Sequence, residues 1–478
     1  MGQTLAKLCT FAQCAFLLVP ILSARPAIGA GHAKITTWLT TPDRAALLAK
    51  QPGTLPFTTS STPQAITITV DPQQRFQSID GFGFALTGGS AQLMVHMEPK
   101  QRAMLIQEMF GHKKDDIHVS YLRVSVGASD MNDHVFSYDD LPDGEQDPQL
   151  ASFSIAPDRA DVIPVLKQIL KINPSIKILA SPWSAPAWMK NNARPKGGEL
   201  KPESYDVYAR YLVRYLKAMQ GEGIRIDALT MQNEPLNPKN TPSLKMEAAE
   251  QATFLKQSLG PLLRREGLST KVILYDHNCD VPEYPLTILD DHDAAQYADG
   301  SGFHLYEGET SAMSKVHAAH PEKNVYFTEQ MVIDKDGAKD LAIARPEAKV
   351  VVGAVTNWSR NVLLWNLAAD PHKGPHTSDG GCPVCEGAIT IDGSAVTRNL
   401  AYYTIAQVSK FVPPDSVHVA SETAGASRLV DVAFETPEGR FVLLVVNQAD
   451  SSQSFGIRFG TRTAQASLAA GAVATYVW

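Results

Sequence analysis

Cysteine is scarce and charges of one sign are not grouped in this 478-residue sequence. Five cysteines are too few for a disulfide-dense scaffold in a chain of this length. The formal net charge of −7 is mild, and no block of lysine or arginine marks a nucleic-acid surface. The composition therefore predicts no nucleic-acid partner and favours a neutral or weakly polar substrate. With 44% hydrophobic residues, the chain can form one large domain and a smaller one.

Motifs of metal, nucleotide and serine-hydrolase chemistry are also missing. The sequence has no HExxH zinc motif, no GxSxG nucleophile elbow and no P-loop. The segment GFGFALTG has glycines at positions 81, 83 and 88, so it lacks the third glycine of GxGxxG, and no ribose-binding acid follows it. We therefore predict neither a metal site nor an organic cofactor.

Long apolar runs are limited to the N-terminus. Lys7 precedes an apolar run from Leu8 to Leu22, and small residues follow around Ala27 to Ala30. This layout is typical of a secretory signal over residues 1–30. The alternative is a membrane anchor, although about fifteen apolar residues are short for a span. The sequence thus predicts an exported protein, periplasmic or extracellular, without stable membrane insertion.

Three cysteines remain after the predicted signal, because Cys9 and Cys14 lie within it. Cys382 and Cys385 form a CxxC pair, for which an exported location favours a local disulfide. A redox site would need a thioredoxin-like unit around the pair, and a zinc site would need two further ligands. Neither is visible, so we predict a disulfide and a buried free thiol at Cys279.

The hydrophobic pattern divides the chain into three parts. Residues 31–77 contain alternating β-branched segments, AKITTWLTT and AITITVD, which predict strands. Over residues 78–409, short apolar runs alternate with stretches of helical period. The predicted strands are residues 81–87, 119–126, 177–183, 226–232, 271–276, 301–306, 324–330 and 361–367, and helices are predicted over 100–110, 161–172, 205–220 and 250–265. Residues 410–478 return to strands alone.

Eight strand-then-helix units predict a (β/α)8 TIM barrel rather than an open doubly wound sheet. The strands before and after it can pair in one β-sandwich. We therefore predict an α/β protein whose barrel, over residues 78–409, is associated with an all-β sandwich domain. That sandwich is formed by N-terminal strands from residues 31–77 and C-terminal strands from residues 410–478.

Polar and aromatic residues follow most of the predicted barrel strands. In chain order they are Asp80 and Phe84, Arg123 and Asp130, Trp183, Asn233 and Glu234, His304 and Tyr306, Glu329, and Trp365 with Asn366. Barrel enzymes place their chemistry at the C-terminal ends of the strands, so we expect these side chains to share one site.

Two of these residues, Glu234 and Glu329, would face each other across the barrel mouth. A carboxylic acid and a carboxylate on either side of a bond are the minimal equipment for glycoside hydrolysis. We expect the aromatic wall to raise the pKa of the acid and the arginine to keep the nucleophile ionised. Tryptophan faces suit the apolar faces of pyranose rings. A lone glutamate could equally be a salt-bridged strand-end residue, but the pair favours catalysis.

Several segments resemble glycoside hydrolase family 30, which includes lysosomal glucosylceramidase and microbial β-1,6-glucanases. They are IDGFGFALTGGSA, YLRVSVGASD, LASPWSAPAWMK, MQNEP, HLY, FTEQ and WNL, and they occur in the family's order along nearly the whole mature chain. The family fold, a barrel joined to a sandwich built from both chain ends, agrees with the predicted strands.

The resemblance implies a role for each matching residue. Glu234 would be the general acid/base and Glu329 the nucleophile of a retaining reaction, with carboxyl groups about 5–5.5 Å apart. Asn233 would bond the sugar 2-hydroxyl, and Arg123 would lie beside the nucleophile. The remaining substrate-binding residues would be Asp130, Trp183 and Trp365 around the bound sugar, and His304 and Tyr306 near the nucleophile.

The resemblance leaves the leaving group open. Met131 stands where the lysosomal enzyme has an aromatic residue, and the loop DPHKGPHTSDGGCPVCEGAITID is similar to microbial members. The leading expectation is a glucosylceramidase-type β-glucosidase; alternatives are an endo-β-1,6-glucanase, a β-xylosidase or xylanase, a related endo-glycanase, or a non-catalytic carbohydrate-binding protein. The predicted partners are a β-linked glucoside, glucan or glycolipid, and no oligomeric state is predicted.

Overall fold

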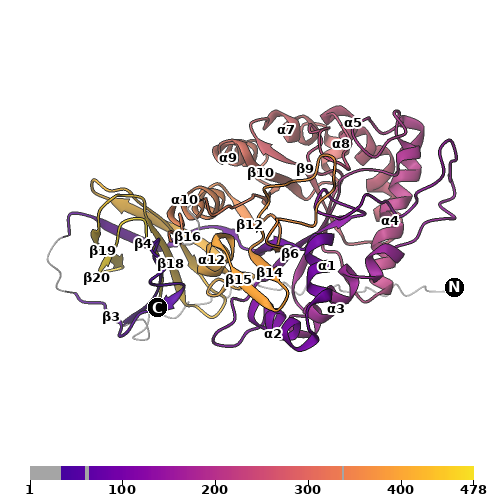
Figure 1. The fold of residues 1–478 in the computed structure, drawn as a ribbon. Helices are drawn as coiled ribbons and strands as arrows, with labels where there is room; N and C mark the ends of the chain where they lie inside the picture. Colours follow the sequence, from indigo (N-terminus) through magenta and orange to yellow (C-terminus); the bar gives the residue numbers. More distant parts are fainter. Residues whose placement is uncertain (1–33, 60–63, 336–338) are drawn as a thin grey trace, which may run out of the picture. The chain divides into compact units, whose positions relative to one another are not determined.

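Parallel strands and helices alternate along the middle of the chain and close into a barrel (Figure 1). The structure is a computed structural model that describes residues 34–59, 64–335 and 339–478. In that part of the chain the barrel has eight strands, in the closed order β10-β11-β12-β5-β6-β7-β8-β9. They are β5 Gly81–Ala85, β6 Tyr121–Val126, β7 Lys177–Pro182, β8 Ala228–Thr230, β9 Lys271–Cys279, β10 Gly300–Gly308, β11 Asn324–Glu329 and β12 Ser359–Leu364. All eight predicted strands are confirmed.

Helices follow the strands around the barrel. They are α1 Gly88–His96, α2 Pro99–Phe110, α3 Val162–Ile172, α4 Tyr205–Gly221, α5 Ala248–Phe254, α6 Gly260–Arg265, α7 Glu283–Leu289, α8 His292–Ala295, α9 Ser311–Ala319, α10 Ala344–Pro346, α11 Gly353–Thr356 and α12 Leu400–Ser409. Short 3₁₀ turns are η1 Ala156–Arg159, η2 Ala187–Met189 and η3 Pro202–Ser204, and π-helical turns are η4 Leu255–Leu259 and η5 Glu347–Val352. The helix predicted over 250–265 is present as α5 and α6 with the π-helical turn η4 between them. The turn lies just before Pro261, whose backbone nitrogen has no N–H to donate to the helix.

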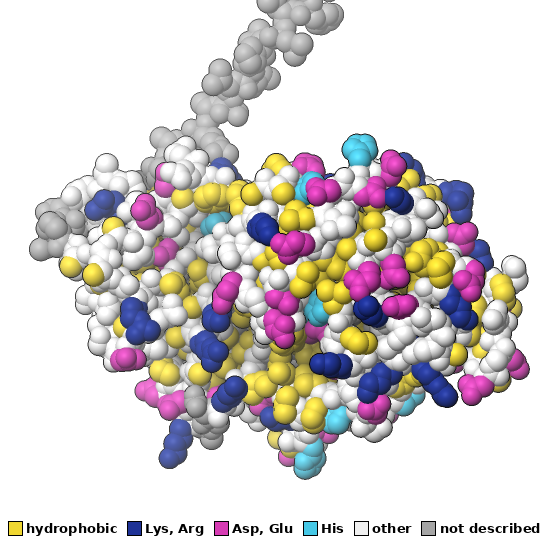
Figure 2. Space-filling view, turned by 90° about the horizontal axis from the view of Figure 1, so that it is seen from above, with side chains coloured by type: hydrophobic (Ala, Val, Ile, Leu, Met, Phe, Trp, Pro, Cys, Tyr) yellow, Lys and Arg dark blue, Asp and Glu magenta, His cyan; other side chains and the backbone are white. Residues whose placement is uncertain are grey.

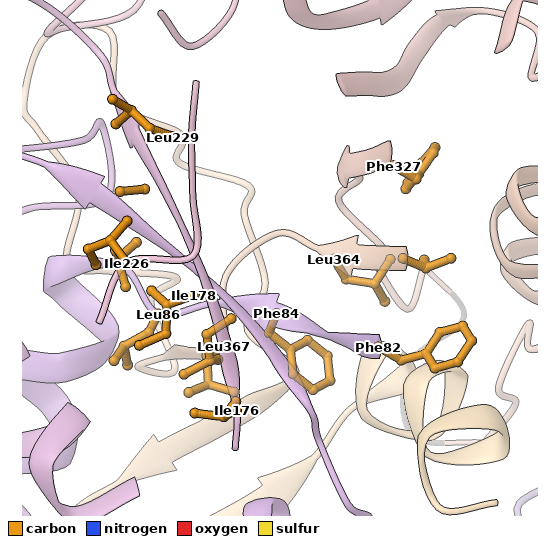
Figure 3. Close-up of a cluster of buried hydrophobic side chains, with 14 of the residues drawn as sticks. Phe82, Phe84, Leu86, Ile176, Ile178, Ile226, Leu229, Phe327, Leu364 and Leu367 are labelled. Carbon is orange, nitrogen blue, oxygen red and sulfur yellow. The ribbon is translucent and has the colours of Figure 1, made fainter. Parts of the chain in front are cut away.

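The period-two alternation of the strands separates two apolar layers. In β6, Leu122 and Val124 join the layer between strands and helices, whereas Tyr121 points into the barrel interior. Figure 3 shows part of the outer layer, where Phe82 and Phe84 of β5 lie near Leu364 of β12. The same alternation turns Arg123 inward.

Gly83 allows β5 to approach β6 closely. A Cβ atom at this position would lie 1.8 Å from the carbonyl oxygen of Tyr121, which is far inside van der Waals contact. The GFG segment that resembles half of a nucleotide-binding motif is therefore a barrel strand whose glycine serves backbone packing.

A second sheet is built from both ends of the chain. Its order is β2-β1-β21-β18-β17-β16-β4-β19-β20, and β3 pairs with β1. The strands are β1 Lys34–Thr40, β2 Ala49–Lys50, β3 Leu55–Pro56, β4 Thr67–Ser78, β16 Val417–Ala424, β17 Leu429–Glu435, β18 Phe441–Asn447, β19 Gln453–Phe459, β20 Arg462–Leu468 and β21 Val473–Val477. Because β1 pairs with β21 and β4 with β16, N-terminal and C-terminal strands share one sandwich, as predicted. Strand β20 was not predicted, since RTAQASL is largely small and polar.

Strand β18 links the sandwich to the barrel. Val442, Leu444 and Val446 belong to the large core that includes the barrel strands, whereas Leu443 and Val445 on the other face belong to the sandwich core. This explains the unbroken apolar run FVLLVV, since a strand buried on both faces needs no polar alternation.

A small sheet follows the barrel and precedes α12. It consists of β13 Ala368–Ala369, β14 Ile389–Asp392 and β15 Ala395–Arg398, and the loop between β13 and β14 carries a disulfide that joins Cys382 to Cys385. Cys279 is a buried free thiol. Both cysteine predictions are confirmed.

The predicted signal over residues 1–30 lies outside the described residues. Among the residues that are described, no helix combines the length and the apolar character needed to cross a bilayer. Figure 2 shows acidic and basic side chains interspersed over the face in view, in keeping with the even spread of charge in the sequence.

Candidate active site

Arg123 is the centre of a buried hydrogen-bond network at the C-terminal ends of the barrel strands. Its guanidinium donates to Glu329 Oε2, to Asn233 Oδ1 at 2.7 Å and to Asp276 Oδ2 at 2.8 Å. Its Nε donates to Ser181 Oγ at 3.2 Å. Four of its five N–H donors are thus used, which fixes the arginine in one orientation.

Asp276, within β9, is a member of this network that the sequence reasoning missed. Its carboxylate accepts from Thr230 Oγ1 at 2.8 Å and from Thr328 Oγ1 at 2.6 Å, and it lies 3.0 Å from His304 Nε2. Burial opposes its ionisation, but the charge of Arg123 and these hydrogen bonds hold the pKa of Asp276 well below its usual range. The strand-end rule that selected the other residues would also have found it, because the predicted strand KVILYD ends on Asp276.

Glu329 ends β11 and is held at both carboxylate oxygens. Arg123 binds Oε2, and the hydroxyl of Tyr306 donates to Oε1 at 2.9 Å. The same hydroxyl accepts from the backbone N–H of Met331 at 3.1 Å, which ties Tyr306 to the chain just after β11. Glu329 therefore has one defined position in the mouth.

Glu234 lies opposite, four residues after β8. Its Oε1 is 3.2 Å from His304 Nδ1, and its Oε2 accepts from Asn237 Nδ2 at 2.7 Å. Its backbone has φ of 45°, and its N–H donates to the carbonyl oxygen of Asp276 at 2.9 Å. A left-handed conformation at a glutamate is costly, and such conformations concentrate at functional sites. Asn237, the last residue of MQNEPLN, was also missed by the sequence reasoning.

The two glutamates come close together. One oxygen of Glu234 and one of Glu329 lie within 4.8 Å of each other, and both side chains are buried. Retaining glycosidases have carboxyl groups about 5–5.5 Å apart, whereas inverting enzymes separate them by about 6.5–9.5 Å to admit a water molecule. The close approach of these oxygens favours the retaining class over the inverting class.

Aromatic rings form the wall on the other side of the mouth. Trp183, after β7, and Trp365, after β12, stack with ring centroids 5.4 Å apart, and the guanidinium of Arg123 lies 4.8 Å from the Trp183 ring. Cys385 and the partly buried Cys382 pack with these two rings, so the disulfide loop supports the wall from behind.

Asp130 lies in the loop after β6, where that wall meets the glutamates. Its carbonyl oxygen accepts from the N–H of Thr377 in the disulfide loop at 2.9 Å. Burial and the charges of Glu329 and Glu234 raise the pKa of its carboxyl to about 8. A neutral carboxyl can donate a hydrogen bond as well as accept one.

The expected pKa values of the glutamates are wrong for this site. Burial acts to raise the pKa of Glu234, but hydrogen bonds from His304 and Asn237 and the charge of His304 outweigh it and lower the pKa to about 2. Burial also raises the pKa of Glu329, and there the charges of His304 and Arg123 do not fully offset it. The cation that decides this difference, His304, could not be placed from the sequence.

His304 is protonated at neutral pH. Burial opposes its charge, but the charge of Glu329 and the bonds to Asp276 and Glu234 raise its pKa to about 9. Both ring nitrogens then donate, Nε2 to Asp276 and Nδ1 to Glu234. We expected His304 near the nucleophile; its Nδ1 is in fact nearer to Glu234, at 3.2 Å, than to Glu329, at 3.9 Å.

Two residues that we placed at the mouth lie elsewhere. Asp80 precedes β5, at the opposite end of the barrel, where it accepts from Lys177 at 2.8 Å and Arg360 at 3.0 Å. Phe84 packs in the apolar layer outside the strands. Nine of the other ten predicted site residues, Arg123, Asp130, Trp183, Asn233, Glu234, His304, Tyr306, Glu329 and Trp365, are brought to one end of the barrel. Asn366, the tenth, accepts hydrogen bonds from Thr87 at 3.0 Å and from Ser90 at 2.8 Å at the start of α1.

The same cluster also contains residue types that can bind a metal ion. Within the described chain, Glu234, His304 and Glu329 each offer one ligand atom in mutual reach. A metal-ligating histidine must be neutral, whereas His304 is held protonated between two carboxylates. The residues present therefore suit proton transfer better than metal binding.

A closed (β/α)8 barrel with two glutamates at its mouth and tryptophans beside them defines a glycoside hydrolase. Residues 79–412 match the glycosyl hydrolase family 30 TIM-barrel domain, and residues 415–476 match the family's beta sandwich domain. The chain belongs to glycosyl hydrolase family 30 and is a glycosidase, as the motifs predicted.

Relatives within the family differ in substrate. The chain is 32% identical over 396 residues to an endo-1,6-β-D-glucanase of Aspergillus fumigatus, covering 78% of each chain. It is 28% identical over 415 residues to the lysosomal acid glucosylceramidase of Mus musculus, covering 81% of this chain and 78% of the relative. A solved endo-β1,6-glucanase superposes with a TM-score of 0.85 at 33% identity, covering 93% of this chain and 99% of that one.

Proposed function

We propose that this protein is a retaining β-glycosidase that hydrolyses β-1,6-linked glucan. The observation that supports the retaining reaction is the approach of Glu234 and Glu329 to within 4.8 Å across the barrel mouth. The linkage is supported by similarity: the endo-1,6-β-glucanases match at 32–33% identity, and the mouse glucosylceramidase at 28%. The glucosylceramidase-type activity that led our expectations therefore takes second place.

In the first step, Glu329 attacks the anomeric carbon while Glu234 gives a proton to the glycosidic oxygen. The C–O bond to the leaving group breaks, and the sugar is left as an ester of Glu329. In the second step, Glu234 takes a proton from water, and the resulting hydroxide displaces Glu329. Two inversions retain the β configuration, and neither step needs a metal or an organic cofactor.

Position, rather than resting pKa, supports the two roles. Arg123 and Tyr306 fix both oxygens of Glu329, as a nucleophile aimed at one carbon requires. Glu234 ionises readily, but protonated His304 lies 3.2 Å away, so a proton is available to it at hydrogen-bond distance. His304 and Glu234 would therefore act as one proton-carrying pair.

The aromatic half of the mouth would hold the sugar whose bond is cleaved. Asn233 Oδ1 is occupied by Arg123, which leaves the amide Nδ2 to donate to the sugar 2-hydroxyl, a contact that should strengthen in the transition state. Asp130 would bind further hydroxyls, and Trp183 with Trp365 would face the ring. The substrate reaches the protein outside the cytoplasm if residues 1–30 act as the predicted export signal.

The Glu329→Gly variant tests the nucleophile. We expect its turnover of 4-nitrophenyl β-glucoside to fall at least about 10⁴-fold, because no covalent intermediate can form. Added azide fits the space of the missing carboxylate, attacks from the same face and should yield α-glucosyl azide. Unchanged turnover in this variant would overturn the assignment.

The Glu234→Gly variant is the matched control. With 2,4-dinitrophenyl β-glucoside, which needs no acid, Glu329 can still form the ester, and azide should then give the β-azide. The same anomer from both variants would contradict the separate roles. The linkage is tested with the wild-type protein, by comparing the products that it forms from β-1,6-glucan, β-1,3-glucan, xylan and glucosylceramide.

A further inference from the structure

A histidine beside Glu234 has no hydrogen-bond partner among the residues that the structure describes, and it has no part in the reaction described above. His277 lies in β9 directly after Asp276 and is only 8% exposed. Its Nδ1 is sealed from solvent without a hydrogen-bond partner, and no partner for Nε2 is found in the described parts of the chain. A buried polar group left unpaired costs free energy, so its place next to the active site calls for a function.

The order of strands around the barrel divides the mouth into two halves. Trp365, Asp130 and Trp183 follow β12, β6 and β7, which lie on one side of the ring. Glu234 follows β8, while His277 belongs to β9, the next strand around the barrel. If the sugar that becomes bonded to Glu329 rests against the tryptophans, the group that Glu234 protonates lies on the side of β8 to β10.

The structure offers room on that side. A cavity of about 650 Å³ is lined by Tyr306 of β10 and by Gln330 and Met331, the two residues after Glu329. Its lining includes Tyr306, which holds Glu329, but neither Glu234 nor His277, so the cavity gives open space on the β10 and β11 side of the mouth. A volume of this size accommodates a ligand larger than one sugar ring.

His277 lies close to the acid and to the histidine that contacts it. Its ring centroid is 6.3 Å from that of His304, whose Nδ1 contacts Glu234, and the charge of Glu234 acts on His277 directly. Burial lowers the pKa of His277, so the ring is neutral and carries one donor and one acceptor nitrogen. Since Nδ1 is sealed, Nε2 is the atom left to meet a ligand.

We propose that His277 is a specificity-determining residue whose Nε2 hydrogen-bonds a hydroxyl of the leaving group. The site would then favour leaving groups that carry hydroxyls close to the cleaved bond, such as a sugar, over aryl groups that carry none. This inference rests on the proposed glycosidase function and extends it to the recognition of the leaving group.

The His277→Phe variant removes both nitrogens and keeps a ring against Tyr275 and His304, which lie 5.8 and 6.3 Å away between centroids. The measurement is kcat/KM for a β-1,6-linked glucose oligosaccharide divided by kcat/KM for 4-nitrophenyl β-glucoside. We expect this ratio to fall about tenfold, which corresponds to about 1.4 kcal/mol. His277→Gln, which restores a polar group, should give a ratio between those of the wild type and His277→Phe.

Tyr275→Phe is the control for local packing. It removes a hydroxyl that bonds the backbone of Asn278 in the same strand, and we expect the ratio to stay at the wild-type value. An unchanged ratio in His277→Phe, whether both activities fall equally or neither falls, would overturn the inference while leaving the glycosidase assignment intact. If the wild-type protein cleaves neither substrate, the proposed function fails and the inference fails with it.

Discussion

Two charged clusters occupy opposite ends of the same barrel. Where the strands begin, Asp80 meets Lys177 and Arg360, whose side chains are 27% and 21% exposed. Where they end, Asp276 meets Arg123 and His304, all with fully buried side chains. Water can screen and replace the first set of contacts but not the second. The first cluster resembles an ordinary ion pair near the surface. The second keeps charged groups buried at the end of the barrel where the substrate would bind.

The hydrogen bonds around the two aspartates show the same difference. Asp80 uses one carboxylate oxygen for both of its cations. Asp276 uses both oxygens, with Thr230 and Thr328 contributing bonds beside the two cations. A carboxylate held by so many donors cannot shift when charge changes nearby, which is what a pre-organised site requires.

Among the buried carboxyl groups compared here, the largest effect is expected from Asp276→Asn. The change keeps the shape but removes the negative charge between Arg123 and His304, which leaves two buried cations with fewer counter-charges. We expect kcat/KM for 4-nitrophenyl β-glucoside to fall about 10²- to 10³-fold and the free energy of unfolding to fall by about 3–5 kcal/mol. Turnover and denaturant unfolding measure the two quantities. Wild-type activity in a folded variant would show that the buried network is not needed for catalysis.

A buried carboxyl without a hydrogen-bond partner among the described residues gives the intermediate case. Glu347 in η5 is fully buried, and neither of its oxygens has a partner in the described chain. Burial raises its pKa well above the ordinary value of 4.5, so it is neutral in the folded protein and ionised in the unfolded chain at neutral pH. The unfolded state then binds fewer protons, and stability falls as pH rises above about 4.5, by about 1.4 kcal/mol per pH unit.

Glu347→Gln should remove this pH dependence. We expect the variant to be more stable than the wild type by up to about 3 kcal/mol at pH 7 and to lose this advantage as the pH falls to about 4. Thermal or denaturant unfolding at both pH values tests the prediction. An equal difference at the two pH values would mean that ionisation of Glu347 in the unfolded chain is not the cause.

The smallest effect is expected from Asp80→Asn. Lys177 and Arg360 keep access to water when the charge of Asp80 is removed, so the loss of stability should be about 1 kcal/mol. Activity on 4-nitrophenyl β-glucoside should stay within about twofold of the wild type, because the site lies at the other end of the strands. A large loss of activity would break the contrast between the two ends of the barrel.

Most of the fold could be predicted from the sequence, but the end of the barrel at which a residue lies could not. All eight barrel strands and the pairing of the two chain ends could be predicted, because period-two and helical patterns record which faces are buried. Strand β20 was missed, since RTAQASL contains small and polar residues and its burial depends on β19 beside it. Asp80 was misplaced because a polar residue next to a strand looks the same at either end of it.

The pKa values were the least predictable part of the site. We expected the apolar wall to decide the state of Glu234, but His304, 70 positions further along the chain, contacts it through Nδ1. Electrostatic effects depend on distances of a few ångströms between residues that are remote in sequence. Asn237 is a different case, because it is only three residues from Glu234, and its contact depends on the turn after β8.

The sequence by itself determined the barrel, the sandwich shared by both chain ends, and the side chains available to the site, because burial patterns and motifs are local properties of the chain. Only the tertiary structure decided how those side chains share charge: which oxygen of Glu329 meets Arg123, that Asp276 joins them, and that His277 remains unpaired beside Glu234. These contacts join different strands of a closed barrel, so they exist only after the barrel has closed.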